Sequence, residues 1–305
     1  MSDTVRIVEV GPRDGLQNEK TLVSVEARVA FIENLIKAGL HTIEVGSFVS
    51  PKAIPQMVNS DQVLRAVDHH PDSVFHVLVP NEKGYDAAKA AGAKVIAVFA
   101  SASEGFSKAN INCTIAESIE RFVPVIARAK ADGVKVIGYV SCVLGCPYDG
   151  EIKPPAVVAV TTKLWELGCQ EVLLGDTIGT GTPLKTRQLL RAVGSEMPMA
   201  NVGMHFHDTY GQALANLLAG MEEGSRLIDS AAGGLGGCPY APGASGNIVT
   251  EDLVFMLEAM GLRTGIDLEK LLGVRRILEE AMPGAELFGN LALAGLPKGF
   301  ARAAA

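Results

Sequence analysis

Short runs of β-branched and other apolar residues recur along the whole chain and predict eight strands. Polar or glycine-containing segments separate these runs, which cover residues 5–10, 42–45, 74–79, 95–100, 135–140, 171–174, 201–205 and 227–231. Between the strands, apolar residues return every three or four positions, as at Val29, Ile32 and Leu35, which is the period of an amphipathic helix. The pattern therefore alternates between strand and helix along the chain.

Glycines mark the expected ends of several of these helices. Gly39, Gly92, Gly133 and Gly168 each stand just before a predicted strand, where the left-handed residue that closes a helix is least costly if it is glycine. Eight strand–helix units predict an α/β fold of the (β/α)8 TIM-barrel type. A doubly wound open sheet gives similar local signals, but the strand count favours the barrel.

The segment after the eighth predicted strand contains a loop and two more helices. A loop rich in glycine and proline covers residues 233–246, and two further helices are expected at about residues 248–260 and 268–282. We interpret the loop as a mobile lid and the helices as extra C-terminal cover for the barrel. Because no interdomain linker is visible, we expect residues 1–305 to form a single catalytic domain.

Composition excludes several classes of protein. The 305 residues are 48% hydrophobic and 20% charged, and 27 basic against 34 acidic side chains give a net charge of −7. That sign argues against a surface that grips nucleic acid. No apolar run approaches the roughly 18 residues of a membrane span, and the N-terminus lacks the features of a leader, so we expect a cytoplasmic protein with no membrane partner.

The cysteines do not suggest a structural framework. There are five, an odd number, and none forms a CxxC pair, so neither a disulfide network nor a cysteine-based zinc site is expected. Any functional cysteine is therefore expected to act as a free thiol. Cys142, Cys146 and Cys169 are interpreted as structural, although the first two follow the fifth strand and could approach the barrel mouth.

Active sites of TIM barrels form at the C-terminal ends of the strands, so polar residues directly after a strand carry most weight. Arg13 and Asp14 stand side by side in the turn after the first strand, where a surface ion pair is the less favoured alternative to a functional role. The seventh strand ends with His205 and His207, which point to the same side because the side-chain period of a strand is two.

This histidine pair predicts a metal site, because two inward imidazoles would crowd one another unless something binds between them. Asp14 and a side-chain amide would complete a mixed nitrogen and oxygen set. Such a set suits Mg²⁺ or Mn²⁺ better than tetrahedral zinc.

Glu44 ends the second strand among apolar neighbours, so it is expected to be paired with a cation or functional. Arg13 is the natural partner, because its guanidinium can hold Glu44 and still offer donors to a substrate oxygen. A buried structural ion pair and a direct catalytic role both remain open.

The glycine-rich loop holds Cys238 between a glycine and a proline, which fits a lid that carries a thiol. A dinucleotide fingerprint, a Walker-type lysine and a GxSxG elbow are all absent, so neither a nucleotide-binding fold nor a serine hydrolase is expected. Weak candidates for phosphate contacts are three lysines, each in a loop after a predicted strand: Lys20, Lys52 and Lys108.

Four segments together resemble the hydroxymethylglutaryl-CoA lyase family. They are residues 8–19 (VEVGPRDGLQNE), residues 43–52 (IEVGSFVSPK), the motif HFHD at 205–208, and the loop GGCPYAPGASGN at 236–247. The Arg-Asp-Gly motif is typical of a wider superfamily of metal-dependent lyases and Claisen synthases, whereas the glycine loop is more specific to the lyase. The resemblance extends over nearly the whole chain.

The resemblance implies retro-Claisen cleavage of 3-hydroxy-3-methylglutaryl-CoA to acetoacetate and acetyl-CoA, in leucine breakdown or ketone-body formation. It implies a divalent cation, Mg²⁺ or Mn²⁺, an acyl-CoA substrate and a homodimer. The metal ligands carried over are Asp14, His205, His207 and Asn247. The catalytic residues are Arg13, Glu44, Cys238 and His205, and the substrate-binding residues are Arg13, Gln17 and Ser47.

Several alternatives stay open at this point. Either His205 or a metal-bound water could relay the alcohol proton, so the base is not assigned. A synthase of the same superfamily is the competing enzyme, and a catalytically silent CoA-binding protein is the competing non-enzyme. The C-terminus lacks both the cysteine and the peroxisomal-type tail of some eukaryotic relatives, from which we expect a bacterial protein.

Overall fold

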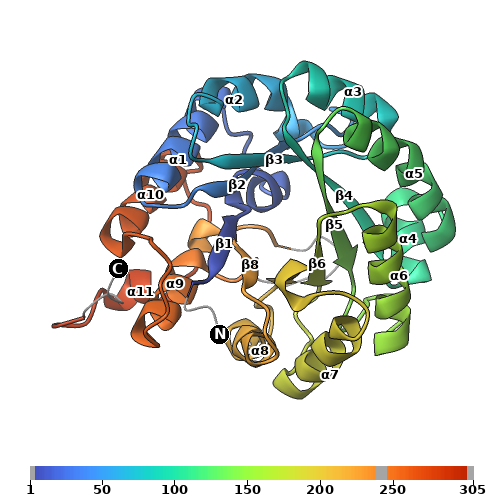
Figure 1. Cartoon of the computed structure of the whole chain (residues 1–305). Helices are drawn as coiled ribbons and strands as arrows, with labels where there is room; N and C mark the ends of the chain where they lie inside the picture. The colour runs from blue at the N-terminus through green and yellow to red at the C-terminus, as the bar shows by residue number, and fades with distance from the viewer. Residues whose placement is uncertain (1–3, 238–245, 301–305) are drawn as a thin grey trace.

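The computed structural model describes residues 4–237 and 246–300, and its eight strands close into a parallel barrel (Figure 1). Each strand pairs with the next in sequence, and the ring closes between β1 and β8, where Arg6 aligns with Leu227 and Glu9 with Ser230. The strands are β1 (Arg6–Glu9), β2 (Thr42–Ser47), β3 (Val74–Leu78), β4 (Val95–Ser101), β5 (Lys135–Ser141), β6 (Glu171–Asp176), β7 (Val202–Phe206) and β8 (Leu227–Ser230). The predicted TIM barrel is confirmed.

Helices form the outer ring of the barrel (Figure 1). The α-helices that follow the strands are α1 (Val25–Lys37), α2 (Ser60–Val67), α3 (Glu82–Ala90), α4 (Glu104–Ile111), α5 (Ile115–Ala131), α6 (Pro154–Leu167), α7 (Pro183–Gly194) and α8 (Ala213–Glu222). Most begin at a residue whose side chain accepts a backbone hydrogen bond, and at α5 Thr114 and Glu117 form a reciprocal capping box.

The four glycines expected to close helices have positive φ angles, between 72° and 114°. Gly39 shows why the position is restricted, because a Cβ there would lie 2.4 Å from the carbonyl oxygen of Gly265. The chain can therefore leave α1 and enter β2 closely packed against the C-terminal segment.

The C-terminal helices are α9 (Thr250–Ala259), α10 (Leu268–Ala281) and a short helix, α11 (Asn290–Ala294), that the sequence pattern did not predict. α10 packs against α1, and α9 packs against the start of the glycine segment that follows β8. Between the ring and the barrel lies one large cluster of buried apolar side chains, drawn from nearly every strand and helix. In the described residues, no helix is long and apolar enough to cross a membrane.

Short irregular turns occur at both ends of the barrel. The π-helical turn η1 (Gly11–Gly15) follows β1, and three 3-10 turns occur at η2 (Pro55–Met57), η3 (Met199–Asn201) and η4 (Ala232–Gly234). β2 has a bulge between Glu44 and Gly46, where its register against β3 shifts. Because bulges re-aim side chains, this irregularity helps to set the direction of Glu44.

Candidate active site

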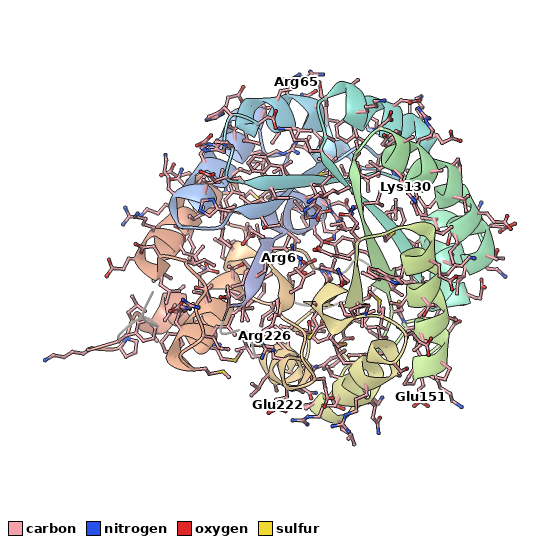
Figure 2. All side chains as sticks on the ribbon, in the orientation of Figure 1. Arg6, Arg65, Lys130, Glu151, Glu222 and Arg226 are labelled. Carbon is pink, nitrogen blue, oxygen red and sulfur yellow. The ribbon has the colours of Figure 1, made fainter. Side chains whose placement is uncertain are left out.

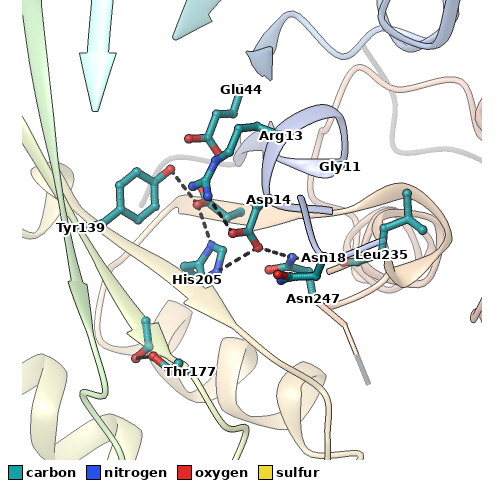
Figure 3. Close-up of polar contacts among 12 residues, drawn as sticks. Gly11, Arg13, Asp14, Asn18, Glu44, Tyr139, Thr177, His205, Leu235 and Asn247 are labelled. Atoms are coloured by element: carbon teal, nitrogen blue, oxygen red, sulfur yellow. Dashed lines mark hydrogen bonds and ion pairs between the residues drawn. The ribbon is translucent and has the colours of Figure 1, made fainter. Parts of the chain in front are cut away.

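The candidate site lies at the C-terminal ends of the strands, where several polar side chains converge (Figure 3). β1 leads into η1, whose second residue is Pro12; proline suits the first turn because it lacks an N–H that would be unpaired there. The turn carries Arg13 and Asp14 toward the end of β7, which bears His205. Segments far apart in the sequence therefore meet at one edge of the barrel.

Asp14, His205 and His207 offer three ligand atoms that lie within 4.8 Å of one another. Nε2 of His205 is 3.8 Å from Oδ2 of Asp14, and the two imidazole rings are 5.5 Å apart. The expected convergence of the aspartate with both histidines is present. This geometry leaves room for one cation between the three side chains.

Asn247, the fourth expected ligand, lies beside them. Its Nδ2 donates to Oδ2 of Asp14 at 2.7 Å and to the carbonyl of Leu235 at 3.1 Å. Its Oδ1 is buried with no hydrogen-bond partner in the described structure, and the same is true of Nδ1 of His207. Buried polar atoms are seldom left unpaired, so these two indicate a place for a bound ligand, and the donor set fits a divalent cation.

The charges of the ligand residues also favour a cation. Burial alone would raise the pKa of Asp14, but Arg13 and the two histidines outweigh it and lower this pKa to about 2. Burial, together with His205, lowers the pKa of His207 to about 4. At neutral pH Asp14 is therefore a carboxylate and His207 has a free lone pair, which are the forms that bind metal.

Gly236 allows the glycine segment to approach this centre closely. Its φ angle is +103°, and a Cβ would lie 2.6 Å from Nδ2 of Asn247 and 3.3 Å from a carboxylate oxygen of Asp14. Any larger side chain would push these two residues apart. The first part of the expected lid loop thus packs directly on the candidate ligands.

Arg13 and Glu44 form the expected ion pair, with Nε of Arg13 2.7 Å from Oε2 of Glu44. The same guanidinium contacts Oδ1 of Asp14 through Nη1 at 3.0 Å. Glu44 is fully buried, and burial raises its pKa to about 7 although Arg13 opposes this effect. Burial also acts to lower the pKa of Arg13, but the two carboxylates outweigh it, so the arginine stays charged.

Asp229 and Tyr139 belong to the same network, and the sequence analysis missed both. Oδ2 of Asp229 accepts from the hydroxyl of Tyr139 at 2.9 Å and lies 3.0 Å from Nδ1 of His205. A carboxylate behind a metal-binding histidine fixes its ring and directs Nε2 toward the metal. Burial lowers the pKa of His205, but Asp229 and Asp14 more than offset this and raise it. One signal was available, because Asp229 is the only charged residue in the predicted strand 227–231.

Glu9 was also missed, and it fastens the start of the glycine segment. One carboxyl oxygen accepts from the backbone N–H groups of Gly11 and Ala232, each at 2.9 Å, and the other accepts from the hydroxyl of Thr250 at 2.7 Å. This fully buried side chain therefore links β1, η4 and α9. The one sequence signal was a carboxylate within a mostly apolar predicted strand.

The other two expected substrate-binding residues, Gln17 and Ser47, lie near the mouth. Ser47 ends β2 with a buried Oγ, and Gln17 follows η1 with a buried Oε1, and neither atom has a hydrogen-bond partner among the described residues. The three lysines suggested as phosphate contacts are exposed. Lys108 lies within α4 and not in a loop, which corrects one detail of the prediction.

Cys238, the expected lid thiol, lies outside the described residues. Cys142, Cys146 and Cys169 are buried. Burial raises the pKa of Cys142 well above its usual range and that of Cys169 to about 12. Both of these thiols stay protonated, in agreement with their interpretation as structural.

Comparison with known proteins adds independent information. A family model described as HMGL-like matches residues 4–278. The chain is 53% identical over 267 residues to the 3-hydroxy-3-isohexenylglutaryl-CoA/hydroxy-methylglutaryl-CoA lyase of Pseudomonas aeruginosa, covering 88% of this chain and 89% of that protein. It is 52% identical over 273 residues to the hydroxymethylglutaryl-CoA lyase of Pseudomonas mevalonii, covering 89% and 91%.

Solved structures agree with the sequence relatives. A hydroxymethylglutaryl-CoA lyase from Pseudomonas aeruginosa superimposes with a TM-score of 0.94 and 49% identity, covering 96% of this chain and 98% of that one. An HMG-CoA lyase from Acinetobacter baumannii, solved with coenzyme A and 3-methylmalate, gives a TM-score of 0.93 and 38% identity, covering 99% and 98%.

Proposed function

The chain belongs to the HMGL-like family of hydroxymethylglutaryl-CoA lyases, and from this we infer that it cleaves 3-hydroxy-3-methylglutaryl-CoA into acetoacetate and acetyl-CoA. The reaction is a carbon–carbon lyase step of leucine degradation. One observation carries the inference: the Arg13–Glu44 pair stands directly beside the Asp14, His205 and His207 group, in a barrel that matches those lyases over nearly its whole length.

The cleavage makes three chemical demands on the site. The tertiary alcohol must lose its proton, the carbon–carbon bond must break so that the alkoxide becomes the ketone of acetoacetate, and the electron pair must be held as a thioester enolate. That enolate then takes a proton on carbon to give acetyl-CoA.

Asp14, His205, His207 and Asn247 are proposed to hold a divalent cation, Mg²⁺ or Mn²⁺, because they mix imidazole nitrogen with carboxylate and amide oxygen. When bound, such an ion acts as a Lewis acid that polarises and orients substrate oxygens. Oδ1 of Asn247 and Nδ1 of His207, both buried and unpaired among the described residues, support this proposal.

Arg13 is proposed to donate to the thioester oxygen as negative charge develops there. Its Nε and Nη1 are held by Glu44 and Asp14, and no contact of Nη2 is seen within the described part of the chain. The guanidinium is fixed in place before the reaction, so it stabilises the enolate without reorganisation. Glu44 is proposed to orient Arg13.

His205 is proposed to hold the cation through Nε2, because Asp229 already engages its other ring nitrogen, Nδ1. Tyr139 donates to the same carboxylate oxygen and keeps Asp229 in position. Both ring nitrogens are then engaged, so His205 is proposed to assist catalysis by positioning the ion, and the base for the alcohol proton stays unassigned.

Cys238 is proposed to protonate the enolate carbon, a role that depends on the family resemblance of the glycine loop. Gln17 and Ser47 are proposed to bind substrate, which is supported by their unpaired buried oxygens. The substrate is proposed to be an acyl-CoA, since the Acinetobacter baumannii structure contains coenzyme A. A homodimer, a cytoplasmic location and a bacterial source stay predictions.

The proposed function is tested by incubating the purified protein, with and without Mg²⁺, with a panel of 3-hydroxy-3-alkylglutaryl-CoA esters. We expect acetoacetate and acetyl-CoA in equal amounts from the methyl substrate. An isohexenyl substrate belongs in the panel because a 53% identical relative is named for both branches. Condensation of acetyl-CoA with a keto acid, without acetoacetate release, would instead identify a synthase.

A further inference from the structure

A second group of possible metal ligands lies on the outer surface, far from the candidate active site. Glu33 is on α1, and His69 and His70 are in the turn between α2 and β3; we call these three residues the surface His–Glu cluster. α1 and α2 are neighbours in the outer ring (Figure 1), and Figure 2 shows Arg65 of α2 pointing away from the barrel. Because the cluster precedes β3, it is at the end of the barrel opposite to the active site.

The three side chains already converge on one point. Oε1 of Glu33 is 2.8 Å from Nε2 of His70 and 3.5 Å from Nε2 of His69. The two imidazole rings are 4.1 Å apart, and one ligand atom from each of the three residues lies within 4.8 Å of the others. All three groups therefore face a common volume.

The backbone prepares His69 for coordination. Its Nδ1 is 2.9 Å from the carbonyl oxygen of Ala66, a contact that places the ring hydrogen on Nδ1. Nε2 then carries the free lone pair and points toward Glu33. Histidines that bind metal usually have their other ring nitrogen fixed in this way.

Two of the three ligand spacings are close to those around a small cation. Ligand atoms about 2.0 Å from a tetrahedral metal are about 3.3 Å from each other. The 3.5 Å separation in the cluster already agrees with this value, and the 2.8 Å separation must widen by only about 0.5 Å. The side chains of His69, His70 and Glu33 are 64%, 26% and 21% exposed, so water can complete the coordination.

We propose that Glu33, His69 and His70 bind a borderline transition-metal dication of the zinc type, which ties α1 to the turn between α2 and β3. Two imidazoles and one carboxylate are a common ligand set for zinc, with a water in the fourth position. The site is distinct from the active-site group, whose additional amide favours Mg²⁺ or Mn²⁺. Its role is to stabilise this part of the barrel.

Calorimetric titration of untagged protein with Zn²⁺ tests the site. We expect the wild type to bind one equivalent more than Glu33→Gln or His70→Ala. In either variant the affinity of the surface His–Glu cluster for Zn²⁺ should fall at least about tenfold. His207→Ala, in the active site, should instead lose a different equivalent and keep this one. His41→Ala is the matched control, because His41 is a nearby exposed histidine outside the cluster.

A thermal scan gives a second readout. Zinc should raise the Tm of the wild type and of His41→Ala by a few degrees more than that of His70→Ala, because a ligand bound only to the folded state stabilises it. Equal stoichiometry and equal Tm shifts in wild type, Glu33→Gln and His70→Ala would overturn the proposal. So would a zinc-edge anomalous map with no peak at these three residues.

Cleavage activity separates this site from the proposed function. We expect the cluster variants, assayed with Mg²⁺, to release acetoacetate at the wild-type rate, since none of the three residues lies near the strand ends that form the active site. Loss of activity together with loss of the zinc equivalent would contradict a separate structural site. Failure of the lyase assay in all proteins would leave the zinc result unaffected.

Discussion

Arg13 illustrates why the chemistry of a single side chain matters here. Its guanidinium contacts Glu44 and Asp14 through different nitrogens. A lysine carries the same charge but has a single nitrogen and cannot hold both carboxylates while facing a substrate.

We therefore predict that Arg13→Lys lowers kcat by about 10² to 10³, the usual cost of losing one oxyanion donor. KM and the affinity for Mn²⁺ should change much less. Steady-state kinetics and Mn²⁺ titration measure these effects. Arg6→Lys, at the other end of β1, is the control and should retain full activity; a comparable loss in that variant would indicate general disruption.

Asp229 is a second residue whose effect depends on one contact, the one with His205. Replacing it with asparagine keeps the size of the side chain but removes the charge that stabilises protonated His205. We predict that Asp229→Asn lowers both kcat and metal affinity by about 10- to 100-fold.

Tyr139→Phe supplies the comparison for this prediction. It removes one hydrogen bond to Asp229 and leaves the carboxylate, so its effect should be clearly smaller. A pH profile of kcat should show the acidic limb displaced toward lower pH in Asp229→Asn. An unchanged profile and unchanged metal affinity would exclude the role given to Asp229.

At the scale of elements, Glu9 joins β1, η4 and α9 by accepting three hydrogen bonds. Burial raises its pKa to about 8, while the hydrogen bonds from Ala232, Thr250 and Gly11 act in the opposite direction. Its carboxyl group is therefore mostly neutral at pH 7. A neutral amide should reproduce most of its contacts.

We predict that Glu9→Gln keeps the fold stable, whereas Glu9→Ala loses about 3 kcal/mol of unfolding free energy because buried N–H groups are left unpaired. Chemical denaturation measures both values. The variant Glu171→Gln, which alters a partly exposed partner of Arg6, is the control and should change stability little.

The same shift predicts a pH dependence of stability. In the unfolded chain Glu9 ionises near pH 4.5, but in the fold it ionises near pH 8. The folded state therefore holds more protons between these values, and the free energy of unfolding should fall as pH rises from 4.5 to about 8. This part of the pH dependence should be missing in Glu9→Gln. An identical profile in both proteins would refute the assignment.

At the scale of the whole molecule, the barrel supplies the rigid frame that brings these elements together. Its core of buried apolar side chains surrounds the strands and does not depend on the candidate metal ligands. Removing the metal should therefore stop catalysis without unfolding the protein.

We predict that a strong chelator abolishes cleavage while far-UV circular dichroism stays unchanged. Restoring the metal at about 100 times its Kd should raise Tm by about 5 °C, from the linkage between binding and folding. His207→Ala should lose this rise and remain folded. Full activity in metal-free protein would contradict the proposed metal site.

Much of the fold could be predicted because it follows from local physics. The apolar runs, the amphipathic helices and the glycines at helix ends are properties of short segments, and all eight strands lie within a residue or two of their predicted positions. The two histidines of β7 share a face because the side-chain period of any strand is two. α11 was missed because five residues give too little periodicity.

The sequence alone determined the barrel, the polar residues at its strand ends and, through four motifs, the family. Only the tertiary structure decided which buried carboxylates support the candidate site. Glu9 and Asp229 lie in strands whose sequence pattern predicts ordinary core strands. Their partners are 223 and 24 residues away along the chain. Local patterns carry no information about such contacts, because the pairing of β8 with β1 and with β7 creates them.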